Sequence, residues 1–412
     1  MGTMTESENT TALRSEQASL GNSDQQALKT SFARVGETGE KAVAYFYGQL
    51  FAAHPHLRAL FPASMDYQRD RLMRALVRIT ESLSNQGALD EYLAQLGRDH
   101  RKYGVRDEHY PAVGQALLAT LAKFAGDAWT PAAADAWLAT YQHAAAVMTT
   151  AAGEAAADTP PWWRAEVVQH DRRRRNLAIV TVQPDSAVPY QAGQHLSVQT
   201  PRWHRVWRRY SVANAPREDG RIQFHIRAVA GGWVSTSLVQ HTKPGDPLIL
   251  GPAAGTMTAP PPSTQPMLCA AGGTGLAPIK AIVEETIRGA PRSDRRPVQL
   301  YVGARIADDL YDMVDLWSLQ ECHPWLDIIT AVEERLGDSP GRGLVHEVIA
   351  RKAPLADLPD AFLAGPPAMV ERTLQVLTTA GLPGARIRHD LVALKAPSSL
   401  RELSGESHGC PR

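Results

Sequence analysis

Four consecutive residues near the middle of the chain, Arg208, Arg209, Tyr210 and Ser211, place two guanidinium groups, a phenol ring and a hydroxyl side by side. The guanidinium of Arg208 can hold a phosphate through two parallel charge-assisted hydrogen bonds. The ring of Tyr210 can stack on an isoalloxazine, and the hydroxyl of Ser211 can bond a ring nitrogen. The same four residues could also form an edge strand with a surface arginine and no ligand. The prediction of flavin binding therefore depends on the neighbouring segments.

Composition restricts the classes of protein to be considered. The 412 residues predict two or three domains, and 43 basic residues balance 43 acidic ones, which argues against a nucleic-acid partner. No apolar run approaches the roughly 18 residues that span a bilayer, and residues 1–23 lack the features of a secretory signal, so we expect a cytoplasmic protein with a disordered lead-in. The three cysteines are far apart, which excludes a disulfide framework or an iron–sulfur motif.

The first third of the chain, residues 24–155, predicts an all-α bundle of six or seven helices. It is rich in Ala and Leu and carries apolar residues at helical spacing, as in the stripe Leu72, Leu76, Ile79 and Leu83. His100 ends another such stripe. A histidine at this position is either a haem ligand or a residue favoured by the helix dipole.

Residues 160–262 follow a proline-rich linker and predict a small antiparallel barrel. Short alternating segments are separated by Gly and Pro, and we expect strands at 176–182, 195–200, 210–213, 222–229 and 247–250. Gly231-Gly232 opens a short helix whose free N–H groups could bind a diphosphate, although the pair is also typical of a hairpin. We interpret Arg172–Arg175 as a solvated strand start, because no aromatic residues lie between the arginines.

Residues 263–395 predict an α/β domain with a parallel sheet. The apolar segment 267–271 runs into a glycine-rich loop, 272–278, and then a helix at 279–287. Strands are expected at 298–303, 327–332 and 361–364, the last followed by Gly365-Pro366. Arg305 could contact a 2′-phosphate, while Asp308 and Asp309 argue against one, so NADH and NADPH both stay open with a preference for NADH. We expect the tail, residues 396–412, to be disordered.

The helical third resembles the globin domain of flavohaemoglobins, in the segment ETGEKAVAYFYGQLFAAHPHLRALF, in YQRDRLMRAL and in DHRKYGVRDEHYPAVGQALLATL. The resemblance implies haem b, with His100 as the proximal ligand and Tyr47 as the distal tyrosine that bonds bound oxygen. Beside them it implies Gln68, Leu72, Phe61 and, near the proximal histidine, Tyr110. The family's glutamate beside that histidine corresponds to Ala152 here, with Glu154 the nearest carboxylate, and Asp99 stands where the family often has a lysine.

The remaining two thirds resemble the ferredoxin–NADP reductase superfamily, through RxYS, AGGWVSTSL and the GGxGxxP loop. The resemblance implies FAD and NADH or NADPH as cofactors. The implied flavin-binding residues are Tyr190, Arg208, Arg209, Tyr210, Ser211, Gly232, Val234 and Ser235. The implied nicotinamide-binding residues are Gly273, Thr274, Gly275, Leu276, Ala277, Pro278, Gly365 and Pro366. Ala364 replaces a cysteine of the family, and the family's flavin-covering aromatic residue near the C-terminus falls near Val392.

Together the two resemblances imply an electron path from NAD(P)H through FAD to haem, and dioxygenation of nitric oxide to nitrate, with O₂, NO and NAD(P)H as the small-molecule partners. The alternative is an NAD(P)H-dependent flavin reductase for an external redox partner, in which the globin binds a gas or regulates. RRYSVANAP is closer to oxygenase reductases than to flavohaemoglobins, and the alanine at 152 also favours this alternative. A protein that only stores oxygen or NO would not need the nicotinamide loops.

Overall fold

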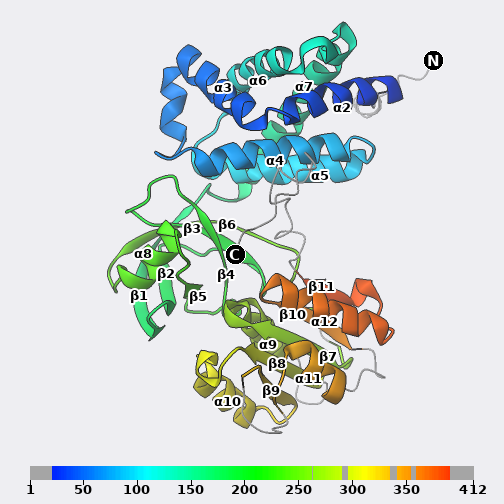
Figure 1. The fold of residues 1–412 in the computed structure, drawn as a ribbon. Helices are drawn as coiled ribbons and strands as arrows, with labels where there is room; N and C mark the ends of the chain where they lie inside the picture. The colour runs from blue at the N-terminus through cyan, green and yellow to red at the C-terminus, as the bar shows by residue number, and fades with distance from the viewer. Residues whose placement is uncertain (1–20, 262, 290–295, 335–340, 354–358, 390–412) are drawn as a thin grey trace, which may run out of the picture. The chain divides into compact units, whose positions relative to one another are not determined.

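The computed structural model describes residues 21–261, 263–289, 296–334, 341–353 and 359–389 (Figure 1). The described residues up to Thr159 form one compact unit, and those from Pro160 form a second. The first helix begins at Asn22, so two residues that we assigned to the lead-in are helical. Residues 1–20 of the lead-in and the whole predicted tail lie outside the described residues. Within those ranges, no helix is long and apolar enough to cross a membrane.

The first unit is helical, as the apolar spacing predicts, and its described helices are α2 (Asn22–Gly36), α3 (Gly39–Ala53), α4 (Asp66–Ser82), α5 (Gln86–His100), α6 (Tyr110–Ala125) and α7 (Pro131–Asp158). The start of α7 shows how the sequence determines a helix end. Pro131 occupies a first-turn position that needs no N–H partner, and the hydroxyl of Thr130 accepts from the Ala133 N–H at 3.2 Å. Further along α7, the Trp137 indole N–H donates to Ser31 at 3.0 Å inside the core.

Helices α5 and α7 run in the same direction and are packed closely. His143 on α7 meets Asp90 near the start of α5, and Met148 lies against Gly97 one and a half turns later. A side chain at Gly97 would overlap the backbone of Met148, so only glycine allows this approach. The register places the end of α5, and therefore His100, level with the stretch of α7 that follows Met148.

The second unit begins with a six-stranded antiparallel sheet in the order β4-β3-β6-β1-β2-β5. Its strands are β1 (Trp163–Arg174), β2 (Leu177–Pro184), β3 (His195–Gln199), β4 (Arg208–Ser211), β5 (Ile222–Arg227) and β6 (Pro247–Ala254). An isolated bridge between Val212 and Phe224 joins the two edges, so the sheet curls towards a barrel without a continuous closing ladder. The helix α8 (Trp233–Gln240) follows β5 and packs against the same core.

The first strand of this sheet is absent from the strands that we predicted. The arginine run lies at the end of β1, not at a strand start, and Arg173 is not simply solvated because it pairs with Asp171 at 2.7 Å and with Asp315 at 3.2 Å. The alternating burial of Trp163, Ala165 and Val167 is regular, but the following charges obscure the pattern in the sequence.

The other half of the second unit is a parallel sheet, as predicted. Its strand order is β11-β10-β7-β8-β9, and the short edge strand β11 was not among the predicted strands. The strands are β7 (Met267–Gly272), β8 (Val298–Ala304), β9 (Leu326–Val332), β10 (Asp360–Ala364) and β11 (Ile387–His389). The helices are α9 (Leu276–Gly289), α10 (Met313–Cys322), α11 (Val345–Lys352) and α12 (Pro367–Thr379). Parallel strands buried on both faces explain the apolar strand sequences.

One carboxylate joins several segments at the amino end of the parallel sheet. Asp360, the first residue of β10, accepts from Arg296 at 2.7 Å and from Arg386 at 3.2 Å, while Arg296 also donates to the Gln265 carbonyl at 2.6 Å. Arg296 is 2% exposed. Burial would raise the pKa of Asp360, but the hydrogen bonds from the two arginines outweigh it and hold this pKa below its ordinary value.

Asp360→Asn should lower the free energy of unfolding by about 1.5–3 kcal/mol, because it leaves the buried Arg296 without its charged acceptor. The depressed pKa adds stability that is complete above the unfolded-state pKa and is lost as the pH falls through the lower folded-state pKa. The gap between variant and parent in urea unfolding should therefore narrow below about pH 4. Asp327→Asn, at an exposed position of β9, serves as the control. An unchanged unfolding midpoint at pH 7 for Asp360→Asn would contradict this account.

Candidate functional site

In the helical unit, the predicted distal residues lie together. The hydroxyl of Tyr47 on α3 donates to the backbone carbonyl of Gln68 on α4 at 3.3 Å. The ring of Phe61, in the turn between these helices, packs edge-on against Tyr47 with centroids 5.6 Å apart. Burial raises the pKa of the Tyr47 phenol above its ordinary value, so this group is a hydrogen-bond donor at neutral pH. The partly buried Leu72, one turn after Gln68, packs against the same core.

His100 at the end of α5 has the geometry of a haem ligand. Its Nδ1 lies 2.6 Å from the carbonyl oxygen of Leu96 one turn earlier, which leaves Nε2 for a metal. Desolvation lowers the pKa of His100. The hydrogen bond with the Leu96 carbonyl and the charge of Asp99 oppose this shift, while the charges of Lys102 and Arg71 add to it. The imidazole is therefore neutral, which is the form that binds iron. The donor and its orientation fit haem.

The proximal side of this histidine carries a backbone acceptor in place of a carboxylate. On α7, Ala152 is half-buried and Glu154 is exposed. The hydroxyl of Tyr141 donates to the backbone carbonyl of Tyr110 at 2.5 Å, a bond that does not involve the Tyr110 phenol. Burial raises the pKa of the Tyr110 phenol to about 12. A neutral carbonyl acceptor makes the imidazole less electron-donating than a carboxylate would.

The flavin-binding candidates lie on β4 and beside it. Tyr210 pairs in register with Leu196 of β3, and Ser211 pairs with His195, so both are half-buried at the end of the strand. Burial raises the pKa of Tyr210, which remains a neutral phenol. Tyr190 exchanges bonds with Asn214, donating to its carbonyl at 3.3 Å and accepting from its Nδ2 at 3.1 Å. Two neutral phenols near the end of β4 fit an isoalloxazine.

The turn before α8 is closed by its own side chain. The hydroxyl of Ser235 donates to the Gly232 carbonyl at 3.1 Å and accepts from the Val229 N–H at 3.4 Å. A side chain at Gly232 would overlap both Ser235 and Val229, so glycine is required there. Val234 is buried in the sheet core, and only its backbone can face a ligand. The turn therefore offers backbone N–H groups to a diphosphate, while the Ser235 hydroxyl would have to rotate to join them.

The predicted nicotinamide loops meet at the carboxyl edge of the parallel sheet, where ligands bind in open α/β folds. Gly273–Gly275 form a 3-10 turn between β7 and α9, and a side chain at Gly275 would overlap the backbone of Ala364 and Gly365. Gly365 has φ of +152°, and a side chain on it would approach Gly272. Thr274 lies in the 3-10 turn, and the first turn of α9 contributes the buried Leu276 and Ala277 and then Pro278. Pro366 precedes α12. These close approaches fit a dinucleotide at a helix start.

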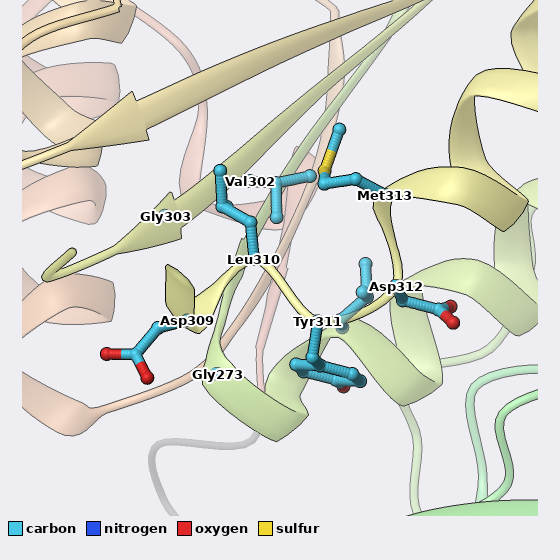
Figure 2. A pocket seen from close by; sticks show the side chains of 9 residues that line it. Gly273, Val302, Gly303, Asp309, Leu310, Tyr311, Asp312 and Met313 are labelled. Carbon is cyan, nitrogen blue, oxygen red and sulfur yellow. The ribbon is translucent and has the colours of Figure 1, made fainter. Parts of the chain in front are cut away.

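A small pocket opens beside this glycine turn and leads to residues that sequence motifs do not reveal (Figure 2). Gly273, Gly303 and the segment from Asp309 to Met313 line it. The Tyr311 hydroxyl lies 2.9 Å from Nδ1 of His225 on β5. His225 is 3% exposed, and desolvation, with Lys280 and Arg173 nearby, lowers its pKa well below the ordinary value. This pair joins the antiparallel sheet to the parallel one.

An ion pair extends this contact between the two sheets, which we call the seam. Nζ of Lys280 on α9 donates to Asp312 at 2.7 Å, and Arg173 of β1 lies 3.8 Å from the other oxygen of that carboxylate. Asp312 is 1% exposed and Lys280 is 8% exposed. Burial raises the pKa of Asp312, and the neighbouring Lys280 opposes that shift. Sequence spacing alone could not reveal this cluster, because its members come from β1, β5, α9 and the segment before α10.

Two further predictions concern Arg305 and Val392. Arg305 after β8 pairs with Glu334 at 3.5 Å, and both side chains are mostly exposed. The Glu334 carboxylate therefore competes with any 2′-phosphate for Arg305. Val392 lies outside the described residues.

Comparisons with known proteins agree with this arrangement. The globin family profile matches residues 44–148, an oxidoreductase FAD-binding domain profile matches residues 163–258, and an oxidoreductase NAD-binding domain profile matches residues 269–375. A flavohemoprotein of Deinococcus radiodurans is 30% identical over 341 residues, which cover 79% of this chain and 83% of that protein. This chain belongs to the flavohemoprotein family. The solved flavohemoglobin of Malassezia yamatoensis shares the fold, with a TM-score of 0.70 at 19% identity over 90% of this chain and 98% of that one.

A second group of relatives matches the flavin and nicotinamide domains of this flavohemoprotein more strongly. The ferredoxin–NAD(P)⁺ reductase component of the naphthalene 1,2-dioxygenase system of Pseudomonas putida is 34% identical over 223 residues, or 54% of this chain. The chain spans 64% of that relative's length. Family membership confirms the predicted architecture of globin, antiparallel flavin domain and parallel-sheet nicotinamide domain, and it confirms haem, FAD and a nicotinamide nucleotide as cofactors.

Gly275→Ala should weaken binding of the nicotinamide nucleotide at least tenfold, because the added methyl displaces the glycine turn from β10. The dissociation constant from NADH titration of the flavin spectrum measures the effect, and FAD content should not change. Gly384→Ala is the matched control, since no atom lies within 4 Å of its added Cβ. Wild-type NADH affinity in Gly275→Ala would show that the turn does not hold the nucleotide.

Proposed function

We propose that this flavohemoprotein is a nitric oxide dioxygenase, which uses NAD(P)H and O₂ to convert nitric oxide to nitrate. The observation that carries the proposal is the presence in one chain of a neutral His100 whose Nδ1 bonds the Leu96 carbonyl, the RxYS strand β4 and the glycine turn after β7. When bound, FAD accepts a hydride from the nicotinamide and releases electrons singly to the haem, where O₂ and NO react. A protein that bound only iron, or only a flavin, would not need all three of these features.

Each candidate residue has a separate role in this proposal. Nε2 of His100 would hold the haem iron, and the Tyr47 phenol, which donates to the Gln68 carbonyl in this structure, would donate its hydrogen bond to a gas bound there. Phe61 and Leu72 pack on the haem face. Arg208 holds the FAD diphosphate, with Arg209 as a second cation on the same strand.

The nucleotide preference that we propose is NADH. Glu334 holds Arg305, and Asp308 and Asp309 add like charge near the place of a 2′-phosphate. We place the activity in the cytoplasm, where reduced nicotinamide nucleotides are regenerated.

A second candidate function has specific support. The flavin and nicotinamide domains are 34% identical to a dioxygenase reductase component, and the histidine acceptor is a backbone carbonyl, which gives the iron a weaker electron donor. In this alternative the reductase half delivers electrons to an external redox partner, and the globin binds a gas and regulates that delivery.

His100→Ala should remove haem and lower NADH-dependent NO consumption by at least two orders of magnitude, because the iron loses its protein ligand. NADH-dependent reduction of an artificial dye should stay within about twofold, since the flavin path is intact. The measurements are the Soret absorbance, NO uptake at an electrode and the dye assay on the same preparation.

His143→Ala, which removes another α-helical histidine of the same unit, should keep haem and NO consumption. A normal haem spectrum in His100→Ala would overturn the ligand assignment. Slow NO consumption by the wild-type protein alone, combined with fast reduction of an added iron–sulfur ferredoxin, would favour the second function.

A further inference from the structure

Two indole rings from distant parts of the chain stack on each other, and each lies in a segment that adjoins proposed flavin-binding residues in the sequence. Trp203 lies in the turn between β3 and β4, and Trp233 is the first residue of α8. Their ring centroids are 4.8 Å apart with 23° between the planes. Trp203 packs against the sheet core, whereas Trp233 is 45% exposed. The stack therefore has an inner ring that is anchored and an outer ring that solvent reaches.

The turn that carries Trp203 is held in an uncommon conformation. Arg205 has φ of +64°, and it is the one non-glycine residue with positive φ in the described part of the chain. Its N–H donates at 2.8 Å to Oε1 of Gln199, which is 4% exposed. Backbone strain of this kind persists only where the surroundings fix it, and it concentrates at ligand sites. The hydrogen bond to Gln199 therefore holds this turn in a defined conformation.

The order of side chains along this segment follows the order of the parts of FAD. From the turn into β4 the chain presents the indole of Trp203, the guanidinium of Arg208 and the phenol of Tyr210. FAD presents adenine, diphosphate and isoalloxazine in that order. Trp233 directly follows the Gly231-Gly232 turn, which is the second proposed diphosphate contact. Both indoles thus belong to the segments that would hold the diphosphate, and Trp203 precedes Arg208 along the chain whereas Tyr210 follows it.

We propose that Trp203 and Trp233 form the adenine platform of the FAD site, with the adenine stacked on the exposed face of Trp233. Two rings already at stacking distance leave no space for a third between them, so the ligand adds to the outer face. The platform makes the protein select FAD over FMN, which has the same isoalloxazine and phosphate but no adenine. This inference rests on the proposed FAD site, but not on NO dioxygenation.

The test is the FAD-to-FMN selectivity of the full-length holoprotein. The protein is equilibrated with mixtures of FAD and FMN, and the bound flavins are separated and quantified. Trp233→Ala should lower the selectivity for FAD about tenfold, within the range that one base stacked on one aromatic ring supplies. Trp233→Phe should retain most of it, because a phenyl ring still stacks. FMN affinity should stay unchanged, which shows that the flavin end of the site is folded.

Trp317→Ala is the matched control, since this indole on α10 is 53% exposed and lies outside the proposed flavin site. It should leave the selectivity unchanged. Wild-type selectivity in Trp233→Ala would overturn the proposal, as would an equal loss of FAD and FMN, which would make Trp233 a purely structural residue. The FAD-to-FMN selectivity and the FMN affinity do not involve haem or NO. A negative result for the adenine platform would therefore leave the proposed dioxygenase function untouched.

Discussion

Hydride transfer requires two atoms in contact, so the reductase half of this protein depends on how its two sheets are held together. The seam that joins them is polar and buried. His225 and Tyr311 share a hydrogen bond across it, and Lys280 and Asp312 form an ion pair that is almost fully enclosed. Removing one member of such a pair leaves an uncompensated buried group, which is strongly destabilising. The seam therefore ties α9, which follows the glycine turn after β7, and the segment before α10 to strands β1 and β5 of the flavin sheet.

The fold was predictable from the sequence wherever one segment carries its own signal. The buried strand before the glycine loop, the alternation around RxYS and the apolar stripe that ends near His100 each depend on neighbouring residues. Strand β1 was missed, since four consecutive arginines mask its alternation. The seam and the stacked indoles were missed for another reason. Trp203 and Trp233 are 30 positions apart in the chain, and only the folded sheet brings them together.

In the globin site, too, some features could be predicted from the sequence and others could not. The sequence was enough to single out Tyr47, Phe61 and His100 as candidate site residues. The hydrogen-bond acceptor of His100 is a backbone carbonyl, and no sequence pattern can reveal such a partner. The contacts between α5 and α7 place the stretch of α7 after Met148, which includes Ala152, near the end of α5. The hydrogen-bond acceptor of His100 in this flavohemoprotein is therefore a neutral group.

Electrons should pass from the nicotinamide through FAD to haem within this single chain. The visible spectrum of the purified protein, recorded anaerobically before and after addition of NADH, tests this path most directly. We predict that the flavin bands bleach and that the Soret band shifts to the ferrous position. A flavin that bleaches while the Soret band stays ferric would contradict the path, because electrons would then stop at the flavin.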